Sequence, residues 1–316
     1  MVMSDFVREN ADLSTATTLL DKWLAKNTHD TQLPGLAMGI IHNGELIWGK
    51  GYGYANIEEK IPVTLDTRFR IASITKTFTA VAILQLYDAE KLRLDDPISK
   101  YLDWFELRYP DAPEITIYHC LTHTSGLPRD ATIPHWTENE FQDWDELVST
   151  TQTRQPMMPP LQDFSYSNLG YSLLGGVIQA VSGEQWEDYI HAHIVAPLEM
   201  TNTLVAPKGS EGEFALGYLS PTDDYSRQAV DFIETKGFSP SASVASSIHD
   251  LVKYARFHLS KGQTPILSGY SLREMHRVHW VNDDWQGGYG LGTRTWRIAD
   301  YTVSGHTGGY KGFLTM

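Results

Sequence analysis

The sequence predicts an α+β fold in which an antiparallel sheet is built from both ends of the chain and is flanked by helices. Near the N-terminus, apolar runs at 36–41 and 45–48 surround Asn43-Gly44, the strongest short signal for a β-hairpin. Glycine-rich strand patterns close the chain at 287–297, 301–306 and 312–316. The long stretch between these ends carries mainly helical patterns.

The length and composition are those of one large domain. The chain has 316 residues, of which 41% are hydrophobic and 20% are charged, so it can bury a sizeable core. No internal repeat or low-complexity linker divides it. We therefore expect a single domain over residues 1–316, with the sheet at about 30–70 and 285–316 and a helical lobe at about 71–284.

Helices are predicted where apolar residues recur at helical spacing. The first spans 12–26, with an apolar stripe of Leu19, Leu20, Trp23 and Leu24. A long apolar helix begins at Thr75 and ends at about Ala89. Shorter or later helices are expected within 92–101 and at 171–181, 184–194, 246–259 and 268–276. The polar, proline-rich segment 130–160 is expected to be an insertion with a short helix near 138–148 that forms a cleft wall.

Net charge argues against some classes of partner. The formal charge of −14 favours solubility and disfavours nucleic acid, whose partners present a basic face. The single cysteine, Cys120, excludes an internal disulfide framework. No signal peptide is visible at the N-terminus, and no apolar run reaches the roughly 18 residues of a membrane span. A cytoplasmic protein is the default expectation, or an exported one if a leader has been removed.

Ser73 and Lys76 form the central candidate pair. Serine is a weak nucleophile that needs a nearby base, and Lys76 lies one helical turn later on the same face. The helix start adds unpaired N–H groups and the positive end of the helix dipole. An apolar pocket would lower the pKa of the lysine amine and keep it neutral. Ser-x-x-Lys specifies only two residues, but this is the only match in the chain.

A second candidate pair, Tyr166 and Asn168, lies just before the helix at 171–181. Residues two apart in an extended segment point the same way, so both side chains can share a cleft. A tyrosine hydroxyl can relay protons if a positive charge lowers its pKa. An asparagine amide offers a donor and an acceptor to a substrate amide. The alternative is ordinary packing, since Tyr54-Ala55-Asn56 also fits Tyr-x-Asn.

A third candidate is Gly305-His306-Thr307-Gly308-Gly309, at the end of a predicted strand. Small residues there allow another backbone to lie close, as when a substrate adds along a sheet edge. They also leave N–H groups available to an oxyanion. A simple turn after a strand remains the alternative.

Metal and cofactor sites are not expected. His119 and His123 have the i, i+4 spacing of a zinc helix but lack the glutamate of His-Glu-x-x-His. Gly49, Gly51 and Gly53 lack the spacing and the following helix of a dinucleotide fingerprint. We therefore predict neither a metal nor a cofactor.

Taken together and in this order, the motifs Ser73-x-x-Lys76, Tyr166-Ser167-Asn168 and His306-Thr307-Gly308 resemble those of the serine β-lactamase and penicillin-binding protein superfamily. The resemblance is greatest to the branch with class C β-lactamases, D-alanyl-D-alanine carboxypeptidases, D-aminopeptidases and β-lactamase-like esterases. It runs from about residue 36 to the end, and His123-Thr124-Ser125-Gly126-Leu127 supports it. It implies a β-lactamase/transpeptidase-like fold.

The resemblance also implies catalytic roles. Ser73 would attack a carbonyl carbon and become acylated, while Lys76 and Tyr166 would take its proton and pass one to the leaving group. The backbone N–H groups of Ser73 and Gly309 would form the oxyanion hole by analogy. The substrate-binding residues implied in the same way are Asn168, His306, Thr307, Gly308 and Gly309.

The substrate is expected to be a small molecule or short peptide with an amide or ester bond. Class C β-lactamases carry lysine where this chain has His306, and histidine is mostly neutral near pH 7. This difference favours a D-peptidase, carboxypeptidase or esterase. The alternatives are a β-lactam hydrolase and a catalytically silent binding or scaffold module, because fold alone does not fix function.

The end of the sequence carries a further expectation. The chain stops ten residues past His306, within a predicted strand, whereas the resembling family continues with further strands and a C-terminal helix. A bare strand leaves backbone groups unpaired and invites another chain. We therefore expect an incomplete domain, completed by a downstream segment, by a partner copy in a homo-oligomer, or not at all.

Overall fold

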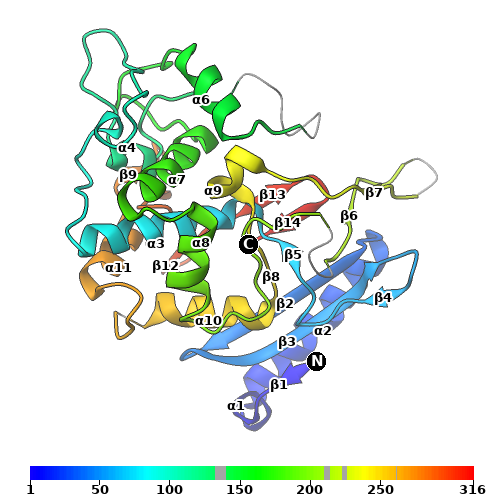
Figure 1. The fold of residues 1–316 in the computed structure, drawn as a ribbon. Helices are drawn as coiled ribbons and strands as arrows, with labels where there is room; N and C mark the ends of the chain where they lie inside the picture. Colours follow the sequence, from blue (N-terminus) through cyan, green and yellow to red (C-terminus); the bar gives the residue numbers. More distant parts are fainter. Residues whose placement is uncertain (132–139, 210–213, 223–225, 261) are drawn as a thin grey trace.

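The computed structural model describes residues 1–131, 140–209, 214–222, 226–260 and 262–316. Its strands are β1 Val2–Met3, β2 Gly35–His42, β3 Glu45–Asn56, β4 Ile61–Pro62, β5 Phe69–Arg70, β6 Gly217–Tyr218, β7 Ala229–Val230, β8 Ala245–Ser246, β9 Trp280–Val281, β10 Gly287–Tyr289, β11 Arg294–Ile298, β12 Tyr301–Gly305, β13 Gly308–Tyr310 and β14 Phe313–Thr315. The arrangement of these strands and of the helices between them is an α+β fold (Figure 1).

The α-helices are α1 Asp5–Glu9, α2 Ala11–Asp30, α3 Thr75–Asp88, α4 Ile117–Leu121, α6 Trp144–Gln152, α7 Asn168–Ser182, α8 Trp186–Ile190, α9 Ser239–Ala242, α10 Ile248–Leu259 and α11 Gly269–His276. Short helical turns of other types are η1 Ala72–Ile74, η2 Ile98–Lys100, η3 His191–Val195 and η4 Lys236–Phe238. Within the described residues, no helix has both the length and the hydropathy that a membrane crossing requires.

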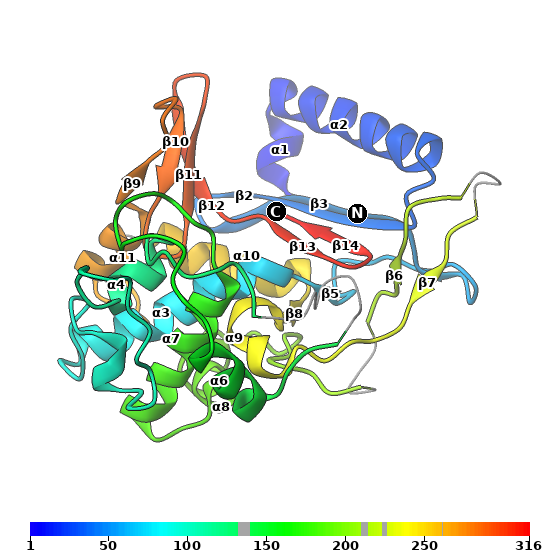
Figure 2. The ribbon, with the colours of Figure 1, turned by 90° about the horizontal axis from the view of Figure 1, so that it is seen from above.

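The N-terminal hairpin is confirmed and lies between two helices. β2 and β3 pair antiparallel around the predicted turn, with α2 on one side and α10 on the other (Figure 2). The buried side chain of Trp48 packs with Leu24 of α2 beneath the helix. The predicted apolar stripe of α2 is only half right. Its Leu20 and Leu24 pack on the hairpin, whereas Leu19 and Trp23 are 61% and 59% exposed.

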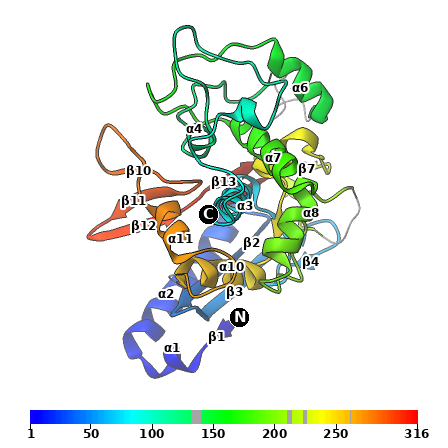
Figure 3. The same cartoon turned by 60° about the vertical axis from the view of Figure 1, so that its left-hand side comes forward.

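Helix α3 is the centre of the helical lobe. It carries apolar or small residues on every side, and such a helix must be covered all round. Figure 3 shows α3 nearly end-on, with α7, α8, α10 and α11 around it. Phe78 of α3 stacks on Tyr254 of α10 at 4.0 Å between ring centroids. The prediction of a long buried helix from Thr75 is therefore confirmed, and Ser73 lies directly before its first turn.

The other predicted helices differ mainly at their ends. The regions 171–181, 246–259 and 268–276 form α7, α10 and α11, as predicted. The helix expected at 184–194 divides into α8 and the wider turn η3. The helix expected near 138–148 is α6, which begins at Trp144 after Asp143 caps it; positions 138 and 139 lie outside the described residues.

The two ends of the chain lie side by side but do not share one ladder. Figure 2 shows β13 and β14 beside the N-terminal hairpin. Among the described residues, β1–β4 form one sheet, β9–β12 a second, and β13–β14 a separate hairpin. The antiparallel pairing is as predicted, but the described strands from the two chain ends hydrogen-bond in separate sheets. The β13–β14 hairpin is instead tied to the turn before Ser73, where Thr315 Oγ1 donates to the Ile71 carbonyl at 3.0 Å.

The strand predicted at 287–297 is two strands, β10 and β11, joined by a turn at Gly290-Leu291-Gly292. Gly292 has φ +84°, a conformation in which side chains other than glycine are strained. A Cβ atom at this position would lie 2.5 Å from the Cβ atom of Ala80 in α3. The turn therefore presses directly on the central helix, and only glycine fits.

We predict that Gly292→Ala destabilises the protein far more than Gly183→Ala. Gly183 has a similar φ of +80° but no heavy atom within 4 Å of a built Cβ, so its variant isolates the backbone cost. That cost is about 1 kcal/mol, and overpacking against α3 adds ~1–3 kcal/mol for Gly292→Ala. Urea unfolding measures both free energies. Equal losses would show that the turn does not press on α3.

Candidate active site

The backbone at Ser73 is held in a costly conformation. Ser73 lies in η1, and Ala72 before it is fully buried with φ +48°. The left-handed region costs a non-glycine residue about 1–2 kcal/mol. Gly308 of β13 packs against this turn so closely that a Cβ atom there would lie 2.3 Å from the Ile71 carbonyl oxygen. The contact of β13 with this turn therefore holds Ser73, which is half-buried, directly before the first turn of α3.

Lys76 is completely buried and has three polar neighbours. Its Nζ lies 2.7 Å from Asn168 Oδ1, 2.9 Å from the Ser241 carbonyl oxygen and 3.2 Å from Ser73 Oγ. Burial lowers the pKa of the amine well below its ordinary value, and Arg129 and Arg294 lower it further against the opposing effect of Asp130. A neutral amine has two hydrogens and one lone pair. It can donate to the Asn168 and Ser241 oxygens and accept the proton of the Ser73 hydroxyl.

Tyr166 lies beside this pair with its hydroxyl protonated. Lys76 Nζ lies 4.9 Å from the centroid of its ring. Burial raises the pKa of Tyr166 to about 12, although Ser73, Arg294 and Arg129 act in the lowering direction. The condition for a tyrosinate relay, a net lowering by positive charge, is therefore not met. A protonated tyrosine hydroxyl can donate a proton, and a neutral lysine amine can accept one.

Asn168 holds Lys76 in place. Its Oδ1 accepts from Lys76 Nζ, and its Nδ2 donates to Asp130 Oδ1 at 2.7 Å. The residue is 2% exposed, at the first position of α7, where Ser167 caps the helix by accepting from the Gly170 N–H. Tyr166 and Asn168 therefore meet at Lys76, as the sequence predicts. The Asn168 carbonyl, however, is already occupied by the lysine instead of being free for a substrate amide.

His306 is the last of three hydrogen-bonded rings, which are His123, Tyr289 and His306. The Ser167 N–H donates to His123 Nδ1 at 3.1 Å, so the His123 proton is on Nε2 and is donated to Tyr289 Oη at 3.1 Å. The Tyr289 hydroxyl then donates to His306 Nε2 at 3.0 Å. This leaves the His306 proton on Nδ1, which donates to the Thr307 carbonyl at 2.6 Å.

This ring chain fixes the charge of His306. Burial lowers its pKa to about 3. His306 is thus neutral and 5% exposed, and both ring nitrogens bond within the protein. Its imidazole is not placed to contact a substrate directly. It positions the segment that follows, in which Thr307 and Gly309 are exposed and Gly308 is buried.

The three sequence motifs therefore converge in space. Lys76 contacts Ser73, Asn168 and the ring of Tyr166, and the rings of Tyr166 and His306 lie 6.2 Å apart between centroids. Five further residues complete the site and were not singled out as site residues from the sequence: His123, Arg129, Asp130, Tyr289 and Arg294. His123 could have been found, because it opens the His-Thr-Ser-Gly-Leu stretch and has φ +58°. The others come from positions without a local motif.

The two histidines at metal spacing serve other purposes. His119 Nδ1 accepts from the Thr116 N–H and caps the start of α4, while His123 belongs to the ring chain. In the part of the chain that the structure describes, no three His, Cys, Asp or Glu side chains gather as a metal site would require.

Two guanidinium groups supply positive charge at the site. Arg129 and Arg294 lie 5.2 Å and 5.8 Å from the Tyr166 ring centroid, measured from Cζ, and both side chains are exposed. Such distances are those of cation–π contacts. Positive charge is therefore present beside the Ser73–Lys76 pair even though His306 is neutral.

The fold and the motif geometry define a β-lactamase-type protein. The chain matches the Beta-lactamase family over residues 20–316, and it belongs to that family. A similar curated protein is protein flp of Staphylococcus aureus strain MW2, which is 33% identical over 239 residues. That alignment covers 73% of this chain but 47% of protein flp, so the chain spans about half the length of the curated relative.

Solved structures show the same fold. An octameric penicillin-binding protein homologue from Pyrococcus abyssi aligns with a TM-score of 0.83 and 28% identity, covering 93% of this chain and 68% of its own. A D-amino acid amidase from Ochrobactrum anthropi SV3 aligns with a TM-score of 0.77 and 25% identity, covering 92% and 83%. The β-lactamase/transpeptidase-like fold predicted from the sequence is confirmed.

We predict that two substitutions shift the Lys76 pKa in opposite directions. Arg294→Gln removes a cation that disfavours the protonated amine, so the pKa should rise. Asp130→Asn removes an anion that favours the protonated amine, so the pKa should fall, while the new amide can still accept from Asn168. NMR titration of labelled lysine side chains measures both. Shifts of the same sign would contradict this electrostatic account.

Proposed function

We propose that this chain is a serine hydrolase that cleaves an amide or ester bond through an acyl-enzyme on Ser73. The observation that carries the proposal is the buried Lys76 amine, which faces Ser73 Oγ at 3.2 Å while its other two contacts are carbonyl oxygens. A base in this state activates a serine without a histidine. The likeness to a D-amino acid amidase, as that protein is described, supports chemistry at an amide bond.

Acylation follows from the positions of the three central side chains. Ser73 Oγ attacks the substrate carbonyl carbon as its proton passes to Lys76 Nζ. By analogy with the family, the N–H groups of Ser73 and Gly309 would bind the resulting oxyanion, and losing one such donor costs about 3 kcal/mol of transition-state stabilisation. The Tyr166 hydroxyl donates a proton to the leaving group as the bond to it breaks, and the tyrosine regains a proton from Lys76.

Deacylation repeats these steps with water. A water molecule attacks the acyl carbon as its proton passes to Lys76. Ser73 Oγ then leaves with a proton donated by Tyr166, and the tyrosine regains a proton from Lys76. The carboxylic acid product departs and the neutral lysine is restored. Proton transfer by positioned side chains of this kind contributes typically about 10²–10⁴-fold in rate.

The two arginines bear on the substrate class. A lysine at position 306 would supply a fixed positive charge for a substrate carboxylate, and the neutral His306 does not supply one. Arg129 and Arg294 supply positive charge beside Tyr166, on exposed side chains that a substrate can reach. A guanidinium pairs well with a carboxylate through two parallel hydrogen bonds. We therefore favour peptides with a free C-terminal carboxylate, as in a carboxypeptidase or D-peptidase, over neutral esters.

A β-lactam hydrolase is the second candidate, because β-lactam antibiotics also carry a carboxylate beside the scissile amide. The same arginines would serve it. The two candidates differ in how quickly the acyl-enzyme is hydrolysed, which mass spectrometry of the intact protein can follow over time.

Ser73→Ala should abolish the covalent adduct and lower hydrolysis by at least about 10⁴-fold, since members of one nucleophile–base unit are not interchangeable. The measurement is intact-mass detection with esters, D-amino acid amides, peptides and β-lactams, alongside turnover. Ser304→Ala is the matched control, because Ser304 Oγ also lies 2.7 Å from a histidine nitrogen, His276 Nδ1. Turnover retained by Ser73→Ala and lost by Ser304→Ala would place the nucleophile elsewhere.

The double variant Arg129→Gln/Arg294→Gln should lower kcat/KM for a peptide acid about 10- to 100-fold more than for the matching C-terminal amide, because only the acid loses a charged hydrogen bond. The ratio of the two substrates cancels any common effect through Lys76. Arg297→Gln, an exposed position on the same strand β11, is the control and should leave the ratio unchanged. Equal losses on both substrates would remove the arginines from substrate recognition.

A further inference from the structure

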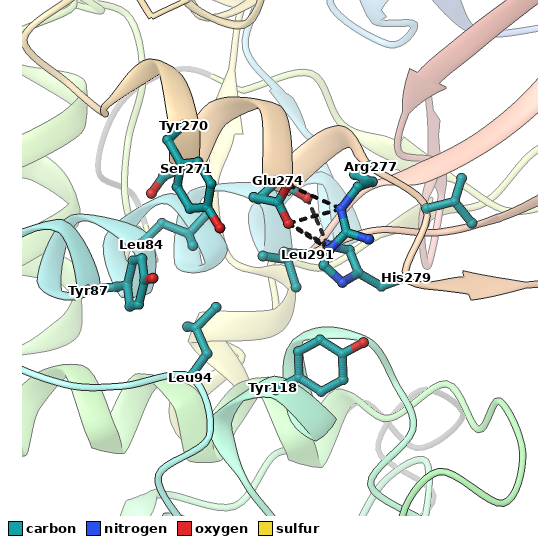
Figure 4. A pocket seen from close by; sticks show the side chains of 11 residues that line it. Leu84, Tyr87, Leu94, Tyr118, Tyr270, Ser271, Glu274, Arg277, His279 and Leu291 are labelled. Carbon is teal, nitrogen blue, oxygen red and sulfur yellow. Dashed lines mark hydrogen bonds and ion pairs between the residues drawn. The ribbon is translucent and has the colours of Figure 1, made fainter.

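A hollow lies toward the far end of α3 from Ser73. It has a volume of about 310 Å³, and α3, α4, α11 and the turn between β10 and β11 contribute to its walls (Figure 4). We call it the α11 pocket. Tyr87, which lines it, lies about three helical turns beyond Lys76, or ~16 Å along the axis. The pocket is therefore separate from the Ser73 site, and its size suits a small ligand.

The inner walls of the α11 pocket are apolar and aromatic. Leu84 of α3 and Leu291 of the β10–β11 turn are buried, at 1% and 0% exposed, and form its base. Tyrosine rings from three different elements stand around them, at Tyr87, Tyr118 and Tyr270. Within the described residues, none of these three hydroxyls hydrogen-bonds to a protein group. A ligand can therefore use both the rings and the hydroxyls, as tyrosine-lined sites commonly allow.

One end of the pocket carries a pair of opposite charges. Arg277 donates to Glu274 through Nε at 2.9 Å and 3.1 Å and through Nη2 at 2.6 Å. Figure 4 shows Glu274 directed into the hollow, with Arg277 and His279 beside it. Hydrogen bonds from Arg277 hold the pKa of Glu274 below its ordinary value, so the carboxylate is ionised. Nη1 of Arg277 has no hydrogen-bond partner among the described residues, and the Arg277 side chain is 58% exposed.

His279 adds no charge to this end. Its Nε2 donates to the Glu274 backbone carbonyl at 3.0 Å, and burial lowers its pKa. Its ring packs against Tyr118 at 5.5 Å between centroids. The local charges are therefore those of Glu274 and Arg277, with Arg273 on the outer face of α11 and the Arg93–Asp95 pair further along the groove.

A ligand with a single charge would match only half of this arrangement. An α-amino acid carries an ammonium and a carboxylate on one carbon, so its ammonium can approach Glu274 while its carboxylate accepts from the free edge of Arg277. Charged hydrogen bonds of this type are the strong ones. Its side chain would then lie over Leu84 and Leu291 between the tyrosine rings. We propose that the α11 pocket binds a free α-amino acid with a large apolar or aromatic side chain.

Calorimetric titration of the unmodified chain with a set of small probes tests the proposal. Phenylalanine, in its L or D form, should bind at least about tenfold more tightly than phenethylamine or 3-phenylpropionate, each of which lacks one charged hydrogen-bonding group. Glycine, which lacks the side chain, should also bind at least about tenfold more weakly. Absence of saturable phenylalanine binding, or equal binding of the singly charged probes, would overturn the proposal.

Variants then locate the ligand. Glu274→Gln and Arg277→Gln should each weaken phenylalanine binding at least about tenfold, with thermal melting to verify the fold. Arg273→Gln, on the same helix but outside the lining, is the matched control. Tyr118→Leu leaves the ion pair intact and should also weaken binding, so the test does not depend on breaking that pair. If Arg294→Gln weakens binding and Glu274→Gln does not, phenylalanine occupies the Ser73 site and the proposal is wrong.

Discussion

The removal of the Lys76 amine from water is the constraint on which the candidate site depends. An ammonium group in this position would be costly, because its hydrogen-bond partners among the described residues are the Asn168 and Ser241 oxygens and Ser73, and none of them is a carboxylate. The protein therefore keeps the amine neutral and turns its lone pair toward the serine. Much of the lobe contributes to this result, because α7, α9 and the β10–β11 turn all cover α3 near Lys76.

Strain is concentrated in the same place. Ala72 and His123 are buried residues with positive φ, at +48° and +58°, and both belong to the site. Neither is glycine, so each conformation must be held by its surroundings. At Ala72 the β13 strand stabilises the positive-φ conformation, because Gly308 lies against the Ile71 carbonyl. At His123 the ring chain through Tyr289 to His306 stabilises it. The His306-Thr307-Gly308 motif thus supports the backbone before Ser73 through packing. It is linked to Ser167, in the Tyr166-Ser167-Asn168 motif, through hydrogen bonds.

Sequence reasoning found the parts of the site that are encoded locally. The spacing of Ser73 and Lys76 on one helix fixes their contact, and the apolar character of α3 fixes the burial of the lysine. The partners of Asn168 and His306 could not be predicted in this way. They are Asp130 and Tyr289, which come from distant segments and belong to no motif. The same limit explains the sheets. The hairpin signal identifies β2 and β3, and the glycine-rich strand patterns identify β12 and β14, but pairing between the chain ends depends on long-range geometry that local patterns do not contain.

The separation of Arg129 and Arg294 from the buried centre has a consequence for divergence within the family. Both are exposed side chains, one in the segment that follows α4 and one at the start of β11. Substitutions on solvent-facing positions usually change folding free energy by less than about 0.5 kcal/mol. Descendants of such a protein could therefore exchange the charge at the entrance for another chemistry in a few steps, while Ser73, Lys76 and their supports stayed intact. The same buried residues could in this way serve different substrate specificities, and each intermediate variant would remain folded.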